Sequence, residues 1–208
     1  QSCNVTFAEL SYELGKSNMQ SAAENFGFND NFSFSDIVLY NSSYPEAVAS
    51  VNELSWSGVG QGRVLVTPLH MAMIASCVAN GGVMMEPKLV RQITGAAGIP
   101  RLRTSGGTYK RVMSEATAQI VGEYMRETVE NGSGNKARVS GYTVCRKTGP
   151  AETSNDKSVS TNGRFGGYIQ ERRCPYQGAA VLEQERSGRT LAARTGAKCD
   201  GAAGAQAA

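Results

Sequence analysis

The segment that most constrains how this chain folds is an apolar helix predicted between residues 67 and 82. Thr67 is a suitable N-cap, and Pro68 stands at the first helical position, where a missing backbone N–H costs nothing. Residues 69–79 are apolar on most sides of a helix, and the Asn-Gly-Gly run at 80–82 predicts where the helix ends. A helix without a polar face is expected to be buried.

Further helices are predicted on both sides of this one. Residues 4–14 form a first helix, with Asn4 as its N-cap and Gly15 as its end, and residues 17–26 form a second. A later helix follows Ser114 as its N-cap, because apolar residues recur there at helical spacing. The intervening segments are predicted to be loops with short turns (29–62), extended chain (83–93) and a polar, glycine-rich connection (94–110).

The last third of the chain changes from helical to extended patterning. Three strands are predicted there, over residues 142–146, 165–169 and 179–182, and the short loops between them favour antiparallel pairing. An alanine-rich tail, about 190–208, is predicted to be a degenerate terminal helix weakened by glycines. Helices first and strands last predict an α+β fold, with an antiparallel sheet beside a helical layer.

Composition excludes several classes of function. The net charge of the 208 residues is only +3 and no basic run accompanies it, so neither nucleic acid nor an anionic membrane is indicated as a partner. The five cysteines show no CxxC spacing, and the single histidine, His70, has no second histidine with which to bind a metal. A metal site and a Ser/His/Asp site are therefore not expected.

The beginning of the chain indicates a piece of a longer protein. No apolar stretch reaches the roughly 20 residues needed to span a bilayer, and no signal peptide is visible. The first residue is Gln1 rather than Met, and helical patterning starts almost at once. We expect a processed or trimmed chain whose export signal or membrane anchor would lie upstream.

Three stretches, taken together, resemble a known family. The first is Ser2-Cys3-Asn4, followed by the helices that end near Gly27. The second runs from the Gly-Gln-Gly turn at 60–62 through the apolar helix to residue 82, and the third is Lys147-Thr148-Gly149. Their order and spacing over residues 2–185 resemble the transpeptidase domain of class B penicillin-binding proteins, which combine Ser-x-x-Lys, Ser-x-Asn and Lys-Thr-Gly motifs. The long middle stretch is the most specific of the three.

The resemblance implies a serine acyltransferase whose acyl donor is a peptidoglycan stem peptide ending in D-Ala-D-Ala, which β-lactams imitate. By resemblance, the Ser2 hydroxyl would relay a proton between the catalytic lysine and the leaving nitrogen, and Asn4 would hydrogen-bond the donor's amide. Lys147 would place positive charge near the substrate carboxylate, and Thr148 would donate a hydrogen bond to it. Gly149 would let the substrate backbone approach the strand closely. No metal or organic cofactor is implied.

The chain departs from the family pattern at the nucleophile. The family's Ser-x-x-Lys precedes Ser-x-Asn by some tens of residues, whereas only Gln1 precedes Ser2 here. Two later matches, at 133–136 and 154–157, lie in polar segments where no helix would hold serine and lysine on one face. We therefore expect this chain to lack the nucleophile and to be inactive alone.

The last third departs further. Pro150 stands where the family usually has a threonine whose backbone N–H is one of two oxyanion-hole donors, and proline has no N–H. Arg146 replaces a small residue, and residues 163–167 (GRFGG) replace an aromatic and larger apolar residues. Each departure is expected to remove packing or to place charge near the core.

These observations predict a penicillin-binding transpeptidase fold, also known from serine β-lactamases, that is incomplete. Residues 1–208 would be the C-terminal portion of one domain, with a helical part over about 1–135 and a strand part over about 141–185. By resemblance, the family's sheet has five strands, of which this chain would supply the last three. The exposed edge and core would make the chain unstable or prone to aggregate.

Three functions remain open. The first is a D,D-transpeptidase of cell-wall cross-linking at the extracytoplasmic face of the bacterial cytoplasmic membrane. It would be anchored by a segment not present here, and it would meet other cell-wall synthesis proteins through missing parts. The second is a non-catalytic penicillin-recognising binding or sensor module, and the third is a β-lactamase, for which no water-activating base is identified.

Overall fold

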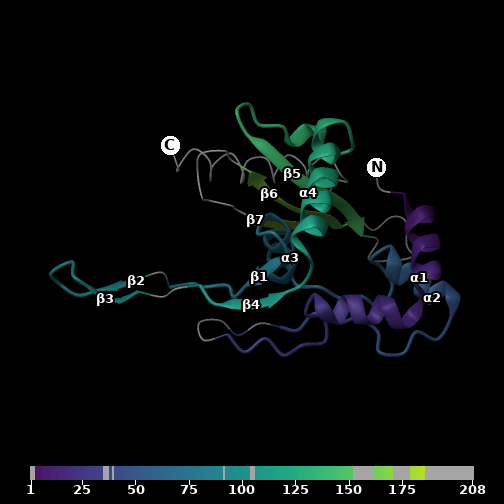
Figure 1. Ribbon diagram of the computed structural model, residues 1–208, viewed down its shortest axis with the longest axis horizontal. Helices are drawn as coiled ribbons and strands as arrows, with labels where there is room; N and C mark the ends of the chain where they lie inside the picture. The colour runs from purple at the N-terminus through teal and green to yellow at the C-terminus, as the bar shows by residue number, and fades with distance from the viewer. Residues whose placement is uncertain are drawn as a thin grey trace.

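The buried helix α3 lies at the centre of the molecule. The computed structural model describes residues 3–34, 38, 40–90, 92–103, 106–151, 162–170 and 179–185. α3 spans Pro68–Ala79, and the Thr67 hydroxyl accepts a hydrogen bond from the His70 N–H at 3.2 Å, so the predicted cap is confirmed. The helix packs against α4, β1, β6 and β7 (Figure 1). Its side chains enter two apolar clusters, one around Met73 and Cys77 and the other around Val78.

Two helices precede α3. α1 spans Asn4–Asn25 and is broken at Gly15, whose φ of 77° and ψ of 165° are not helical. α1 therefore consists of two helices that meet at an angle, and Figure 1 shows this bend. The predicted break at Gly15 is confirmed, but the predicted cap is wrong by one residue. Cys3 is the N-cap, and Asn4 is the first helical residue.

The prediction that residues 29–62 contain only loops and turns is also wrong. α2 spans Val51–Gly58, and the Ser50 hydroxyl caps it by accepting a hydrogen bond from the Glu53 N–H at 3.2 Å. α2 packs against the first half of α1, where the buried Ser11 hydroxyl donates to the Leu54 carbonyl at 3.3 Å. The Ser-x-x-Glu pattern at 50–53 is the sequence signal for this helix start.

The strands at the end of the chain form one antiparallel sheet. β5 (Thr143–Ala151), β6 (Asn162–Gln170) and β7 (Ala179–Glu185) pair in the order β5-β6-β7. The three predicted strands are confirmed, although each is longer than expected. α4 (Glu115–Glu130) covers β5, and the predicted Ser114 cap is confirmed by its hydrogen bond from the Thr117 N–H at 3.1 Å. The short 3-10 helix η1 (Asn135–Ala137) leads into β5.

Two small sheets connect α3 to α4. β1 (Val83–Met85) pairs with β4 (Thr108–Arg111), and between them β2 (Gln92–Thr94) pairs with β3 (Pro100–Arg103). The predicted extended chain at 83–93 is correct at β1 and β2. The predicted connection at 94–110 is wrong, since it contains β3 and most of β4. Figure 1 shows β2 and β3 at the end of a long arm that projects from the rest of the molecule.

The fold is α+β, as predicted, with a helical layer beside an antiparallel sheet. Its described part agrees with a partial penicillin-binding fold of few strands. The predicted terminal helix at 190–208 lies outside the described residues.

Candidate active site

β5 contains the Lys-Thr-Gly motif in its second half. Lys147 pairs with Gly166 of β6, Gly149 pairs with Arg164, and Pro150 pairs with Gly163. Within the described residues β5 is at the edge of its sheet, so its other side has no neighbouring strand. Proline is tolerated in a strand when its missing N–H would point away from the sheet, and an edge strand provides this position. Lys147 itself is exposed.

Arg146, directly before this motif, is completely buried, with 0% of its surface exposed. Two glycines make room for it. A Cβ atom on Gly134 would lie 3.1 Å from the Arg146 Cδ atom, and a Cβ atom on Gly167 would lie 2.8 Å from the Arg146 Cβ atom. The expected charge near the core is therefore observed. However, Gly167 does not simply remove packing, because the Arg146 side chain occupies the space that a side chain at position 167 would need.

The opposite face of β5 anchors the strand to the helical layer. Cys145 is 1% exposed and packs with Tyr168 of β6 and Val78 of α3. Burial raises the pKa of the Cys145 thiol, and it raises the pKa of Cys77 to about 11. Both thiols therefore stay protonated at neutral pH and act as packing groups rather than nucleophiles.

The beginning of α1 contains the other motif. Ser2 lies outside the described residues, whereas Asn4 is exposed in the first turn of α1. Cys3, between them, is exposed, and a hydrogen bond with the Thr6 side chain lowers the pKa of its thiol. In the view of Figure 1, the start of α1 and the C-terminal end of β5 lie on the same side of the molecule.

His70 fixes the other end of α1. Its imidazole is 0% exposed, and Nε2 lies 2.7 Å from the carbonyl oxygen of Phe26, the residue that caps α1. Nε2 therefore carries the proton and donates it to this carbonyl. The rings of Phe28 and Phe32 pack around the imidazole with centroid distances of 5.0 Å each. Burial lowers the pKa of His70, so the ring is neutral and structural.

Of the two Ser-x-x-Lys matches, only the one at 133–136 lies in the part of the chain that the structure describes, and its serine and lysine are not on one α-helix face. Ser133 lies in the loop after α4, and Lys136 belongs to η1. Residues 154–157, the second match, lie outside the described residues. The side chains of Thr148 and Pro150 are also outside them, so only their strand positions are described.

The described part of the chain contains no group of three or more His, Cys, Asp or Glu side chains arranged to hold a metal ion. Nor, within the same residues, does any helix combine the length and hydrophobicity that a bilayer crossing requires.

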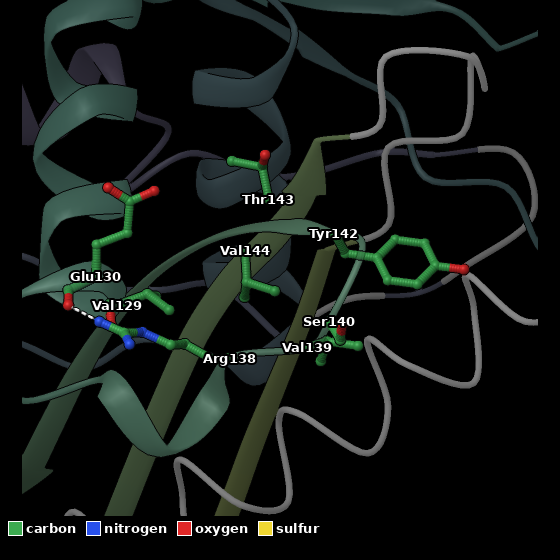
Figure 2. Close-up of a pocket in the computed structure, with 8 residues that line it drawn as sticks. All are labelled: Val129, Glu130, Arg138, Val139, Ser140, Tyr142, Thr143 and Val144. Atoms are coloured by element: carbon green, nitrogen blue, oxygen red, sulfur yellow. Dashed lines mark hydrogen bonds between the residues drawn. The ribbon is translucent and has the colours of Figure 1, made fainter.

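A pocket of about 470 Å³ lies at the start of β5, away from the Lys-Thr-Gly end of the strand (Figure 2). The Arg138 guanidinium crosses it and donates hydrogen bonds to the carbonyl oxygens of Val129 and Glu130. These carbonyls belong to the last turn of α4, so the arginine caps the negative end of that helix. The pocket is therefore part of the α4–β5 packing and contains none of the predicted site residues. Its lining residues are Val129, Glu130, Arg138, Val139, Ser140, Tyr142, Thr143 and Val144.

The α+β fold, with Lys147-Thr148-Gly149 on a strand of the antiparallel sheet and Asn4 at the start of a helix, has the arrangement that the resemblance to penicillin-binding transpeptidase domains implies. Residues 1–199 match the penicillin-binding protein transpeptidase domain family. The chain belongs to this family, and its relatives identify it as the class B type.

Two curated relatives illustrate the match. Penicillin-binding protein 3 of Bacillus subtilis is 27% identical over 175 residues, which cover 82% of this chain and 25% of that protein. The peptidoglycan D,D-transpeptidase PbpA of Mycobacterium tuberculosis is 30% identical over 159 residues, covering 75% of this chain and 31% of the relative. The chain thus spans about a quarter to a third of the length of these relatives.

Solved structures agree with this assignment. The D,D-transpeptidase domain of a peptidoglycan glycosyltransferase from Eggerthella lenta superposes with a TM-score of 0.83 at 26% identity, over 99% of this chain and 52% of that one. Penicillin-binding protein A of M. tuberculosis, in its imipenem acyl-enzyme complex, gives a TM-score of 0.84 at 25% identity, over 97% of this chain and 45% of that one.

Proposed function

We propose that this chain is the C-terminal portion of a domain that cross-links peptidoglycan by D,D-transpeptidation. The observation that supports the proposal best is the position of Lys147 and Gly149 on β5, which is an edge strand within the described residues, so that an extended substrate could lie alongside it. The relative seen as an imipenem acyl-enzyme supports a serine acylation mechanism and the binding of β-lactams.

In the proposed mechanism, a serine outside these 208 residues attacks the stem peptide's D-Ala-D-Ala bond, and a lysine one helical turn later accepts its proton. The Ser2 hydroxyl relays that proton to the leaving nitrogen, and the Asn4 amide orients the donor strand. The Lys147 ammonium and the Thr148 hydroxyl hold the substrate carboxylate. Gly149 has no side chain, so the substrate backbone approaches β5 closely.

Pro150 weakens this machinery. The backbone N–H after Lys-Thr-Gly would stabilise the oxyanion, and a proline at this position cannot donate. Losing one such donor costs on the order of 10²–10³ in rate. A slow transpeptidase is therefore proposed, at the extracytoplasmic face of the membrane and held there by a part of the protein outside this chain. Parts of the protein outside this chain would also bind other cell-wall synthesis proteins.

The test is acylation by penicillin, measured as intact protein mass. The 208-residue chain is expected to remain unmodified. A longer protein that supplies Ser-x-x-Lys is expected to gain the mass of one penicillin, and Pro150→Thr in that protein should raise the rate by about tenfold or more. Ser133→Ala is the matched control, because this loop serine has no role in the proposal.

Two outcomes would contradict the proposal. A penicillin adduct on the 208-residue chain would show that a serine within it is the nucleophile, and peptide mapping would identify that serine. Failure of the longer Pro150→Thr protein to acylate would instead indicate a non-catalytic penicillin-recognising module.

A further inference from the structure

Residues 87–90, 92–103 and 106–107, here called the hairpin arm, project from the body of the molecule (Figure 1). Its two strands, β2 and β3, pair only with each other within the described residues. The arm is not part of either apolar cluster. A projecting hairpin that adds nothing to the core is available for contacts with another molecule.

The charge of the hairpin arm has one sign. The sequence from residue 87 to residue 107 contains no Asp or Glu, and its charged residues are all cationic: Lys88, Arg91, Arg101 and Arg103. Lys88 lies at the base and pairs with Glu86 at 3.4 Å. Arg101 and Arg103 are exposed, and no carboxylate in the described part of the chain forms an ion pair with either of them. The strand β3 therefore presents a positive potential to any approaching partner.

The two faces of the hairpin arm differ in chemistry. Ile93 lies opposite Leu102, so both side chains share one face, and they are 48% and 51% exposed. Arg103 lies opposite Gln92 on the other face. The register shifts between Ile93 and Thr94 and leaves Arg101 without an opposite residue, so strand alternation does not place its side chain on either face. One face thus has the apolar pair, and the other has Arg103.

The outer edge of β3 has no neighbouring strand in the described residues. The backbone N–H and C=O groups along such an edge can pair with an extended segment of another chain. A strand added there would point alternate side chains to the two faces. An acidic residue would meet Arg103 on one face, the apolar residue next to it would cover Leu102 on the other face, and Arg101 would add positive charge along the same edge.

We propose that the edge of β3 is a docking strand for an extended segment of another protein in which acidic and apolar residues alternate. A second copy of this chain fits poorly, because antiparallel pairing of two β3 strands would place arginines beside arginines. An anionic bilayer fits less well than a strand, because a surface engages one face of the arm whereas an added strand engages both. A third alternative is that the arginines only protect the strand edge from aggregation. This alternative does not explain why the apolar side chains of Ile93 and Leu102 are also exposed.

The test uses the 208-residue chain and labelled peptides, and it does not depend on acylation. A fluorescein-labelled heptapeptide of alternating glutamate and valine is titrated by fluorescence anisotropy, alongside an isomer in which the same residues stand in two blocks. The alternating peptide is expected to bind saturably and the block isomer more weakly. The double variant Arg101→Glu/Arg103→Glu should weaken binding by about tenfold or more and should instead bind a lysine–valine peptide.

The control variant is Arg126→Glu, an exposed arginine of α4, which should leave peptide binding unchanged. Circular dichroism checks that each variant keeps its fold. Equal binding of the block isomer would overturn the proposal, and so would unchanged binding by the double variant. Binding to phosphatidylglycerol vesicles without binding to the alternating peptide would also overturn it, in favour of a membrane contact.

Discussion

Gly82→Ala is expected to be among the most damaging single-methyl substitutions in this chain. Gly82 follows α3 with φ +86°, and its carbonyl accepts a hydrogen bond from the Val112 N–H at 2.9 Å, which joins α3 to the start of α4. A Cβ atom at Gly82 would lie 2.2 Å from the carbonyl oxygen of Met113. This contact is with backbone, so it cannot be relieved by rotating a side chain.

The expected loss follows from three contributions. A positive φ costs an alanine about 1–2 kcal/mol, the overlap about 1–3 kcal/mol, and a weakened Val112 hydrogen bond up to about 1 kcal/mol. The sum is about 2–6 kcal/mol, a large part of the 5–15 kcal/mol typical of a domain. Gly60→Ala is the matched control, because Gly60 has φ +80° but nothing lies within 4 Å of its added Cβ. It should lose only about 1–2 kcal/mol.

Urea unfolding followed by circular dichroism measures both losses. A midpoint shift for Gly82→Ala at least twice that of Gly60→Ala is the expected result. Equal shifts would refute the reasoning, because they would show that the Met113 contact adds nothing to the cost of the backbone conformation.

Two further predictions concern titratable groups. Because burial lowers the folded-state pKa of His70, its contribution to stability is fully present above the unfolded pKa of about 6.5 and is lost as pH falls toward the lowered value. Unfolding free energy should therefore decrease from pH 7 to pH 5, and a slope that persists in His70→Leu would contradict this. Among the described cysteines, Cys3 should react fastest with iodoacetamide, because it is exposed with a lowered pKa while the other two are buried with raised ones. Mass mapping after a short pulse checks the order, and equal labelling of Cys145 would count against it.

The sequence correctly predicted α3 and α4, which begin at clear N-cap residues. Thr67 and Ser114 cap α3 and α4 as expected, because a cap depends only on the residues next to it. β5 extends past its predicted end at residue 146 because pairing with β6 continues through Pro150 and Ala151. That pairing is a tertiary effect, and local strand propensity for Gly and Pro argues against it.

The candidate site was only partly predictable for the same reason. The motif at Lys147 is visible in the sequence, and the structure describes its strand, but nothing local predicts that Arg146 is fully buried. The explanation lies in Gly134 and Gly167, which are distant in sequence and leave space for the arginine stem. Likewise, β2 and β3 are short strands that form because they pair with each other. All their residues are exposed, so neither strand has the buried apolar face by which a strand is recognised in a sequence.

The break at Gly15 divides α1 between two supports. The first half packs against α2, where the Ser11 hydroxyl donates a hydrogen bond to the Leu54 carbonyl. The second half is joined to α3 by the hydrogen bond from His70 to the Phe26 carbonyl. Only glycine readily adopts the φ and ψ at this joint, so the angle between the halves is set there. The orientation of the first half of α1, which includes Asn4, therefore depends on the backbone conformation of Gly15. A substitution at Gly15 could change where Asn4 lies relative to α3, although Gly15 belongs to neither motif.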